Sequence, residues 1–371
     1  MIIGIDARPL ILKNPTGIAT YLINVLQYIG KHDKNNKYIL YTSKPFECER
    51  NFGPNFEVKY IYSRIGTFWL RYRIPRIIKK DKVDIFWGPS HILPLKVKGI
   101  KYVLTVHDLA LLINPAWGEK NNSKIQNFYL PRSIRDADYI LTDSESTKKD
   151  IKKICKNIEH HIECIYLGGS DLGADSNINE KEIELVKQKF GIKKKYFIFV
   201  GTIEPRKNII SLVHAFESLQ EDCQLVLIGG LGWRYKEILK AIDESPLREN
   251  IIMTGYVKKE EKIALLKSAE AFVYLSHYEG FGIPILEAME TETLILSASN
   301  SSLPEVGGNA VLYVRDENNC EEIVNAMKRV LNINKEEKKD FILKEISNLK
   351  KFSWEKCGKE TMNAILGESI K

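Results

Sequence analysis

Short, continuously apolar runs alternate with helix-like segments along the whole of this 371-residue chain. The runs are rich in Ile, Val, Leu, Phe and Tyr and lack regular polar positions, which is typical of strands buried on both faces. Strands that alternate with helices predict doubly wound parallel sheets of the α/β class. We expect strands at residues 2–6, 38–42, 58–62, 84–87, 102–107 and 139–143, and at 196–201, 223–229, 251–255, 271–276 and 294–298.

Length and turn residues divide the chain into two expected domains. A chain of 371 residues is longer than one hydrophobic core usually serves. Gly, Ser, Asn and Asp gather at 167–180, so we expect two Rossmann-like domains, 1–170 and 171–352. Ser353 precedes a last helical pattern. Ligands of parallel sheets bind beyond the carboxyl ends of the strands, which places the expected site in a cleft between the domains.

Glu279 and Glu287 frame the segment E-G-F-G-I-P-I-L-E. Gly280 and Gly282 predict a loop that can approach a ligand closely, and Pro284 predicts the first turn of a helix. The N–H groups at a helix start favour an anion. Because a carboxylate on each side of that anion could hold sugar hydroxyls, the segment indicates a nucleotide-sugar site rather than a simple phosphate site.

Arg206 and Lys207, in G-T-I-E-P-R-K-N, follow a predicted strand that ends at Gly201. Arg can hold a phosphate through two hydrogen bonds, and Lys adds a point charge. Fixed cations where negative charge develops are among the larger contributions to catalysis. We therefore expect this pair to bind a diphosphate, and the alternative is a pair of solvated loop cations.

Two loops of the first half hold further candidates. The turn N-P-T-G at 14–17 precedes a helical pattern, so it is either an ordinary turn or a source of N–H groups for a phosphate. His107 ends a predicted strand beside Asp108, which makes it a site candidate, although a lone histidine is more often structural. His91, in G-P-S-H-I-L-P, is a weaker candidate for the acceptor side.

These segments, with V-H-D-L at 106–109 and S-N-S-S-L-P-E-V at 299–306, resemble the retaining glycosyltransferases of family 4, whose fold is GT-B. The resemblance covers nearly the whole chain and depends on the joint order and separation of the motifs. It implies two Rossmann-like domains facing across a cleft, with the acceptor bound by the N-terminal domain and the nucleotide sugar by the C-terminal domain. It also implies that the last helix, about 353–371, crosses back to the N-terminal domain.

The resemblance assigns roles to individual residues. Glu279 would bind hydroxyls of the transferred sugar, and Glu287 would accept hydrogen bonds from ribose hydroxyls. His107 would lie beside the hexose and bond it or help to stabilise an oxocarbenium-like state. The implied catalytic residues are His107, Arg206, Lys207 and Glu279. The further implied donor contacts are Gly17, Gly201, and the N–H groups of Phe281, Gly282 and Ile283.

The family also implies a course for the reaction. No protein nucleophile is needed, because the leaving diphosphate helps to deprotonate the acceptor hydroxyl on the same face of the sugar. We expect no obligatory metal and no cofactor besides the nucleotide-sugar co-substrate. The turn T-G-Y-V at 254–257 could flank the nucleobase through Tyr256 or Val257, or Tyr256 could simply pack. The chain is most similar to bacterial mannosyltransferases of surface-polysaccharide synthesis in two segments, I-D-A-R-P at 5–9 and G-T-I-E-P-R-K-N. GDP-mannose is therefore the first donor that we expect.

One stretch departs from the family pattern. Glu290, Thr291 and Glu292 stand where many relatives carry a small glycine-containing turn, and Leu294 replaces a common proline. We therefore expect the helix of the motif to end differently, with an effect on the geometry near Ser299.

A basic and aromatic segment, 64–82, indicates the acceptor side. It holds seven Lys or Arg against one Asp. Its apolar residues, Trp69 among them, could form a face beside Arg71, Arg73 and Arg76 that suits an anionic membrane surface or a lipid-linked diphosphate sugar. An ordinary domain surface over buried aromatics fits equally well. Nucleic acid is the weakest alternative, because no nucleic-acid motif accompanies the segment.

The uneven charge supports an anionic partner for the first half. Residues 1–165 hold 27 Lys and Arg against 16 Asp and Glu, whereas the remainder holds 28 against 32, so the overall +7 is concentrated at the front of the chain. No apolar run is long enough to span a bilayer, and the start M-I-I-G-I-D lacks a signal-peptide pattern. We expect a cytoplasmic protein, with peripheral binding to the inner face of the cell membrane as an additional option.

Cysteines and rival functions complete the sequence analysis. The six cysteines form no C-x-x-C pair and are expected to be reduced, and the spacing of Cys155, His160, His161 and Cys164 fits no common zinc pattern.

Two other functions are the alternatives to a glycosyltransferase. A GT-B nucleotide-sugar epimerase would act on the donor without an acceptor. A two-domain binding protein would bind a donor without turnover. The donor base, the acceptor linkage and the oligomeric state stay open.

Overall fold

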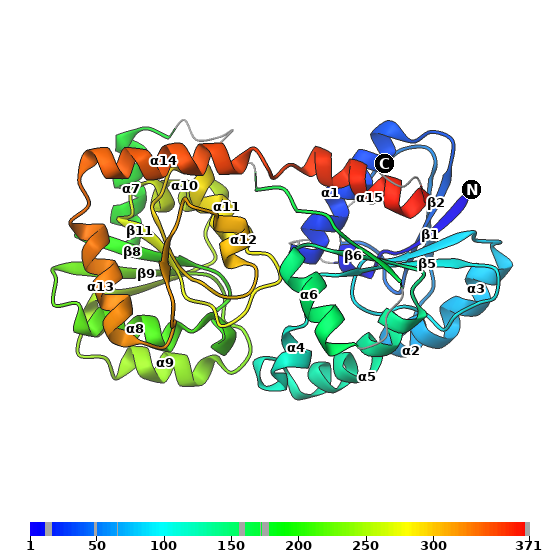
Figure 1. The fold of residues 1–371 in the computed structure, drawn as a ribbon, viewed down its shortest axis with the longest axis horizontal. Helices are drawn as coiled ribbons and strands as arrows, with labels where there is room; N and C mark the ends of the chain where they lie inside the picture. The colour runs from blue at the N-terminus through cyan, green and yellow to red at the C-terminus, as the bar shows by residue number, and fades with distance from the viewer. Residues whose placement is uncertain are drawn as a thin grey trace. The chain divides into compact units, whose positions relative to one another are not determined.

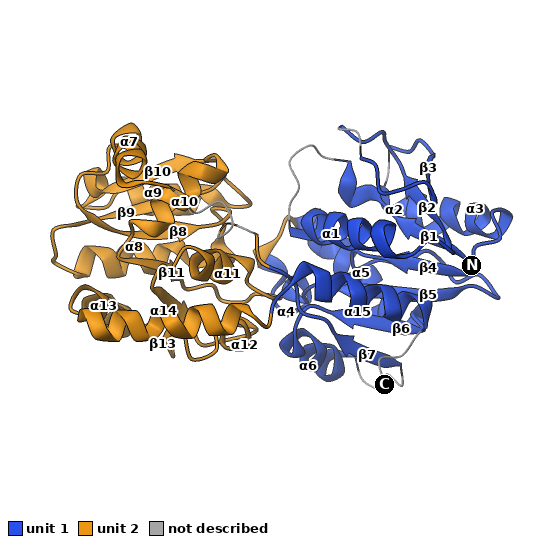
Figure 2. Cartoon of the chain, turned by 90° about the horizontal axis from the view of Figure 1, so that it is seen from above, with its two compact units in different colours: residues 1–116, 120–168, 352–371 blue, residues 117–119, 169–351 orange. Residues whose placement is uncertain are grey.

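The chain forms two compact units (Figure 2). Unit 1 comprises Met1–Ala116, Lys120–Gly168 and Phe352–Lys371, and unit 2 comprises Trp117–Glu119 and Gly169–Lys351. The chain passes from one to the other at Gly168–Gly169, within the predicted connection. Which unit binds the acceptor and which the donor stays a prediction. The computed structural model describes residues 1–11, 17–47, 50–64, 66–155, 160–170, 172 and 178–367.

Unit 1 is built on a parallel sheet. Within the described residues this sheet has seven strands in the order β3-β2-β1-β4-β5-β6-β7. The strands are continuously apolar at its centre because both faces are covered by helices. Their bounds are β1 Ile2–Asp6, β2 Lys37–Thr42, β3 Phe56–Tyr60, β4 Ile85–Gly88, β5 Lys101–Val106, β6 Tyr139–Thr142 and β7 His161–Cys164.

Two groups of helices cover this sheet (Figure 1). Helix α15 packs on α1, and Gly358 of α15 makes this possible, since a Cβ there would lie 2.4 Å from the Cβ of Tyr28. Ser353 caps α15, because its Oγ accepts a hydrogen bond from the N–H of Lys356. The last helix therefore belongs to unit 1. The helices of this unit are α1 Gly17–His32, α2 Gly66–Phe68, α3 Ile74–Lys80, α4 Ala110–Ile113, α5 Lys120–Asp136, α6 Glu145–Ile154 and α15 Trp354–Leu366, with a π-helical segment at Trp69–Arg73.

Unit 2 repeats the same plan. Its parallel sheet has six strands in the part of the chain that the structure describes, in the order β10-β9-β8-β11-β12-β13. The strands are β8 Lys195–Val200, β9 Cys223–Ile228, β10 Ile251–Gly255, β11 Ala271–Tyr274, β12 Ile295–Ala298 and β13 Leu312–Val314. The helices are α7 Glu180–Phe190, α8 Ile209–Ser218, α9 Tyr235–Asp243, α10 Lys259–Lys267, α11 Ile283–Glu290, α12 Leu303–Gly307, α13 Cys320–Leu331 and α14 Lys335–Leu349.

The predicted α/β class and the two doubly wound parallel sheets are confirmed. Each predicted strand is present, with ends displaced by two residues at most. Two strands, β7 and β13, are missing from the prediction. The first is a sheet-edge strand with polar, partly exposed residues, and the second is only three residues long, so neither forms a continuous apolar run.

Among the described residues, no helix combines the length and the apolar character that crossing a bilayer would require.

Candidate functional site

The segment from Glu279 to Glu287 is a loop that leads into a helix, as its glycines and proline predict. Gly282 has a φ of +113°, a backbone conformation that favours glycine. Helix α11 begins at the next residue, Ile283, with Pro284 in its first turn. No side chain among the described residues caps this helix start, an arrangement that favours an anionic ligand.

Two serines hold the loop in front of α11. Ser301 Oγ accepts a hydrogen bond from the N–H of Glu279 at 3.0 Å. Ser302 Oγ lies 2.9 Å from the carbonyl oxygen of Glu279 and 2.7 Å from that of Phe281, and donates toward both. Both serines belong to the S-N-S-S-L-P-E-V segment, which therefore supports the glutamate motif.

Glu279 lies between the two cations that the sequence predicts to bind a diphosphate. Arg206 Nη1 is 2.8 Å from Glu279 Oε2, and Lys207 Nζ is 2.6 Å from Glu279 Oε1. The two cations stand on a 3₁₀ turn that follows β8. Because Lys207 is only 8% exposed and Glu279 only 7%, the alternative of solvated loop cations does not fit this structure.

The charges of this cluster balance one another. Burial would raise the pKa of Glu279, but Arg206 and Lys207 outweigh it and lower that pKa to about 2. Burial lowers the pKa of Lys207, and the attraction of Glu279 opposes this shift. Glu204 forms a second ion pair with Arg206 at 2.8 Å, and Tyr274 Oη accepts from Lys207 at 2.7 Å. The cations are thus fixed by protein groups, as a preorganised anion site requires.

Glu287 is buried on α11 rather than solvated. It is 7% exposed, so the alternative of a solvated helix face is wrong. Its Oε1 accepts two hydrogen bonds, from Ser170 Oγ at 2.6 Å and from Lys262 Nζ at 2.7 Å. Sequence reasoning missed both partners, because Ser170 is 117 positions away in the sequence.

Two of the predicted donor contacts follow strands of unit 2: Gly201 follows β8 and Tyr256 follows β10, and β9 lies between these two strands. A Cβ at Gly229 would come within 1.9 Å of the carbonyl oxygen of Gly201, so the two backbones nearly touch. The ring of Tyr256 lies over Gly230, where a Cβ would meet it at 2.5 Å. Tyr256 is nevertheless 86% exposed, so it is not a core packing residue. Val257 beside it is partly exposed.

His107 is bonded through both ring nitrogens. Nδ1 lies 2.6 Å from Asp143 Oδ2, and Nε2 lies 2.8 Å from the carbonyl oxygen of Pro89. Burial works against a charge on His107, but Asp143 and the Pro89 carbonyl outweigh it and raise the pKa of His107. The neighbouring Asp108 accepts a hydrogen bond from the N–H of Ala110.

His91 lies beside His107 in unit 1. Their ring centroids are 5.5 Å apart, and burial lowers the pKa of His91 to about 4. Its backbone has a φ of +60°, and its N–H donates to the carbonyl oxygen of Thr105 at 3.2 Å. Its Nδ1 has no hydrogen-bond partner in the described part of the chain. His91 is therefore neutral and buried, with one ring nitrogen available for a ligand.

Gly17, the implied phosphate contact in unit 1, is the first residue of α1 and is exposed. The other members of that predicted turn, residues 14–16, lie outside the described residues.

The prediction that Trp69 and Arg71 belong to a membrane-facing surface is wrong. Trp69 is fully buried in the core of unit 1. Arg71 is also buried and donates to the carbonyl oxygen of Leu93 at 2.8 Å. Both residues stand on the π-helical segment that follows α2. Arg73 and Arg76 are exposed, as expected.

The exposed remainder of this region forms a basic-aromatic patch. Arg73 Nη1 donates to the carbonyl oxygen of Tyr62 at 2.7 Å, and Arg64 Nε donates to Tyr62 Oη at 3.2 Å. The rings of Phe68 and Tyr72 lie 5.2 Å apart and are both exposed. We define the patch as Tyr62, Arg64, Phe68, Tyr72, Arg73 and Arg76.

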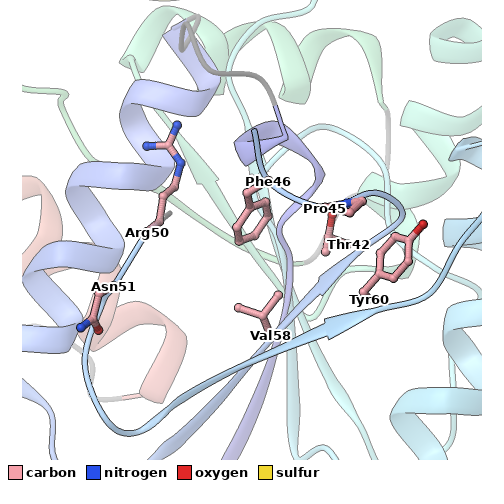
Figure 3. Close-up of a pocket in the computed structure, with 7 residues that line it drawn as sticks. All are labelled: Thr42, Pro45, Phe46, Arg50, Asn51, Val58 and Tyr60. Carbon is pink, nitrogen blue, oxygen red and sulfur yellow. The ribbon is translucent and has the colours of Figure 1, made fainter. Parts of the chain in front are cut away.

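A pocket of about 710 Å³ opens in unit 1 at the carboxyl ends of β2 and β3 (Figure 3). Thr42 and Tyr60 are the last residues of these strands. The lining combines aromatic and apolar groups with an amide and a guanidinium, and it consists of Thr42, Pro45, Phe46, Arg50, Asn51, Val58 and Tyr60. The carboxyl edge of a parallel sheet is where its ligands bind.

Metal-ligating side chains do not gather in the described part of the chain. No three His, Cys, Asp or Glu residues there come together as a metal site would require.

The atypical stretch after Glu287 ends the helix with threonines in place of a glycine turn. Thr291 Oγ1 donates to the carbonyl oxygen of Ala288 at 3.0 Å and lies 2.9 Å from Thr293 Oγ1. Thr293 Oγ1 donates to the carbonyl oxygen of Leu266 at 2.9 Å. Strand β12 then begins at Ile295, and the segment with Ser301 and Ser302 follows this strand.

Two family models match the two halves of the chain. Residues 15–168 match Glycosyltransferase Family 4, and residues 180–344 match Glycosyl transferases group 1. The chain is 32% identical over 294 residues to O-antigen chain mannosyltransferase B of Escherichia coli, covering 77% of this chain and 75% of that protein. It is 27% identical over 261 residues to O-antigen chain mannosyltransferase RfbU of Salmonella typhimurium, covering 69% and 66%. Its structure is similar to sucrose-phosphate synthase from Thermosynechococcus elongatus, with a TM-score of 0.76 at 15% identity, covering 99% and 100%.

The two parallel-sheet units and these similarities define a glycosyltransferase with the GT-B fold. The chain belongs to glycosyltransferase family 4, the group 1 glycosyl transferases.

Proposed function

We propose that the protein moves a hexose from a nucleoside-diphosphate sugar to a saccharide acceptor and retains the anomeric configuration. The observation that carries this proposal is the buried cluster of Arg206, Lys207 and Glu279. Glu279 stands on the loop that leads into the uncapped start of α11, Arg206 and Lys207 stand on the turn after β8, and Glu287 is buried eight residues after Glu279. Cations, helix N–H groups and a second carboxylate are the groups that a diphosphate and a ribose need.

The proposed reaction uses these groups as follows. The bond from the anomeric carbon to the diphosphate oxygen breaks, and negative charge grows on the diphosphate. Arg206, Lys207 and the start of α11 stabilise that charge. The acceptor oxygen bonds the anomeric carbon on the same face, and its proton passes to the leaving diphosphate. Because protein cations meet the diphosphate, the proposal includes no obligatory metal and no cofactor.

His107 is the proposed hexose contact from unit 1. Its ring is held by Asp143, with Nδ1 2.6 Å from Oδ2. Its Nε2 would exchange the carbonyl of Pro89 for a sugar hydroxyl when the donor is bound. Glu279 would bind the hexose in the same way, by sharing an oxygen that now accepts from Lys207 or Arg206.

Mannose from GDP-mannose is the first donor choice. Both relatives described above are O-antigen chain mannosyltransferases, and the first of them is 32% identical to this chain. A role in the synthesis of a surface glycan follows from the same similarity.

The proposed acceptor is a saccharide or a lipid-linked saccharide bound by unit 1. Tyr60 and Phe46 in the pocket at β2 and β3 offer apolar surface for a sugar ring or lipid, and Arg50 offers a charge for a phosphate. Arg73 and Arg76 in the basic-aromatic patch suit an anionic membrane surface, which fits a cytoplasmic protein that binds the inner leaflet. We expect Tyr60→Ala to raise the acceptor KM about fivefold and leave the donor KM unchanged. Leu185→Ala, an exposed apolar change in unit 2, is the control.

The test of the proposed function is release of nucleoside diphosphate from single donors. The protein is incubated with GDP-mannose, UDP-glucose, UDP-galactose or dTDP-rhamnose, with and without a mixture of saccharide and lipid-linked acceptors. Release from one donor, abolished in Arg206→Ala/Lys207→Ala, supports the proposal. Lys338→Ala/Lys339→Ala removes two exposed cations of α14 and is the matched control. No release from any donor with acceptors present, or equal release by the Arg206/Lys207 variant, contradicts it.

A further inference from the structure

Helix α11 contacts the start of unit 2 through two carboxylates. Glu287 and Glu290 are three positions apart, so they share one face of the helix. Glu287 Oε1 accepts from Ser170 Oγ at 2.6 Å, and Glu290 Oε2 accepts from the N–H of Leu172 at 2.9 Å. Ser170 and Leu172 directly follow the point at which the chain leaves unit 1. The helix that carries the donor motif therefore also holds Ser170 and Leu172 of the connection.

Gly169 brings this connection unusually close to the helix. A Cβ at this position would lie 1.8 Å from Glu290 Oε1, and the three nearest atoms are all in the Glu290 carboxylate. Any side chain here would displace that carboxylate. Leu172 is almost fully buried. The backbone of Gly169, the hydroxyl of Ser170 and the N–H of Leu172 thus all lie against carboxylates of α11.

The contacts occupy one oxygen of Glu287 and leave the other open. Ser170 and Lys262 both donate to Oε1, and Lys262 compensates the charge of this buried carboxylate. No donor among the described residues bonds Oε2. A carboxylate held this way has one fixed orientation and one oxygen ready for a ribose hydroxyl.

We propose that Ser170 is a positioning residue that orients Glu287 toward the donor ribose, and that Glu290 holds the connecting residues so that Ser170 can do so. The inference rests on the proposed function, because it takes Glu287 as the ribose contact. It gives a role to Glu290, which departs from the pattern of the family. It also couples the connection to the donor site, so donor binding and the contacts of Ser170 and Leu172 with α11 strengthen each other.

The first test compares ribose and ribose-free binding. Binding of GDP and of UDP to the protein is measured by isothermal titration calorimetry. The titration is then repeated with the 2′,3′-dideoxy analogue of the nucleotide that binds. Ser170→Ala is expected to raise the Kd of the ribonucleotide about tenfold and the Kd of the dideoxy analogue less than twofold, because the lost serine hydroxyl acts only through Glu287. Ser170→Thr keeps the hydroxyl and is expected to restore most of the affinity. Ser218→Ala, on α8, is the control for removal of an unrelated serine.

The second test uses the close approach at Gly169. Gly169→Ala is expected to weaken the ribonucleotide about tenfold, because the added methyl group displaces Glu290. In a Glu290→Ala background, which removes the carboxylate that the methyl would meet, the same change is expected to have no further effect. Hydrogen exchange of the Leu172 amide is expected to slow on nucleotide binding in the wild type and not in Glu290→Ala.

The outcomes separate the two proposals. If the wild type binds neither nucleotide, the result contradicts both the proposed function and the positioning role of Ser170. If Ser170→Ala binds the nucleotide as tightly as the wild type does, the result contradicts only the positioning role. If Ser170→Ala weakens the ribonucleotide and the dideoxy analogue by the same factor, Ser170 is merely structural and the inference is overturned.

Discussion

The ion cluster around Glu279 predicts a large, pH-dependent loss of stability when its charge is removed. The pKa of Glu279 falls from 4.5 to about 2 in the folded protein, because Arg206 and Lys207 outweigh the effect of burial. At about 1.4 kcal/mol per pKa unit, the ionised carboxylate contributes about 3 kcal/mol to folding. A lowered folded pKa stabilises the protein above the unfolded pKa of 4.5, and the contribution is lost as the pH falls from 4.5 toward 2.

Glu279→Gln tests this reasoning with an isosteric neutral side chain. We expect the variant to lose about 3 kcal/mol of unfolding free energy at pH 7, because two cations then lack their shared partner. The difference in unfolding free energy between the wild type and the variant should become smaller as the pH falls from 4.5 toward 2. Urea unfolding at pH 7, 5, 4 and 3 measures this difference, and hydrogen exchange of peptides from β8 shows whether it arises in unit 2.

Glu336→Gln is the matched control, because Glu336 is exposed on α14 and its loss should change stability by less than about 0.5 kcal/mol. The reasoning is refuted if Glu279→Gln is as stable as the wild type at pH 7. A gap that stays constant across the pH range would also refute it, because the loss would then not come from the carboxylate charge.

Three further predictions address activity, burial and packing. Lys207→Met should lower donor turnover about 100-fold or more, because a neutral side chain cannot stabilise the leaving diphosphate, and a turnover assay that finds less than tenfold loss would contradict this role. Glu345 is fully buried, neither carboxyl oxygen has a partner in the described chain, and burial raises its pKa from 4.5 to about 9. Below pH 4.5 the Glu345 carboxyl is neutral in both the folded and the unfolded state, so it costs no stability; between pH 4.5 and 9 it must stay protonated in the folded protein, and the cost in unfolding free energy grows with pH. Glu345→Gln should therefore stabilise the protein by about 3 kcal/mol at pH 7 and by nothing at pH 4, as measured by thermal or urea unfolding. Trp69→Ala should cost about 4 kcal/mol, whereas Phe68→Ala, half exposed next to it, should cost less than about 1 kcal/mol, and equal losses would contradict the burial of Trp69.

The strands and the loop-to-helix motif could be predicted because their signals are local. A strand buried on both faces must be apolar throughout, so β1, β5 and β8 stand out in the sequence. Gly282 and Pro284 likewise carry their own backbone preferences.

The partners of the site residues could not be predicted because they are distant in sequence. Glu279 and Lys207 are 72 positions apart, and only the sheet brings β8 and β11 side by side. His107 pairs with Asp143 at the end of the neighbouring strand β6, not with Asp108. Asp143 is 36 positions from His107, so no local pattern in the sequence identifies it as the hydrogen-bond partner.

The basic segment shows a third limit of sequence reasoning. A regular helix would place Trp69 and Arg73 on one face and allow both to meet a surface. The π-helical segment at Trp69–Arg73 winds differently, and it leaves Trp69 and Arg71 buried while Arg73 is exposed. Nothing in the local composition marks such a segment, so the patch that remains is smaller than the sequence indicated.

The configuration of the product tests the central claim most directly. GDP-mannose, an α-linked donor, is supplied with a lipid-linked saccharide acceptor, and the anomeric coupling of the new linkage is measured by NMR. A retaining transfer gives an α-mannoside, because the acceptor attacks the face that the diphosphate leaves. A β-mannoside would contradict the retaining course, and the absence of any glycoside with every nucleotide sugar and acceptor supplied would contradict the proposed transfer itself.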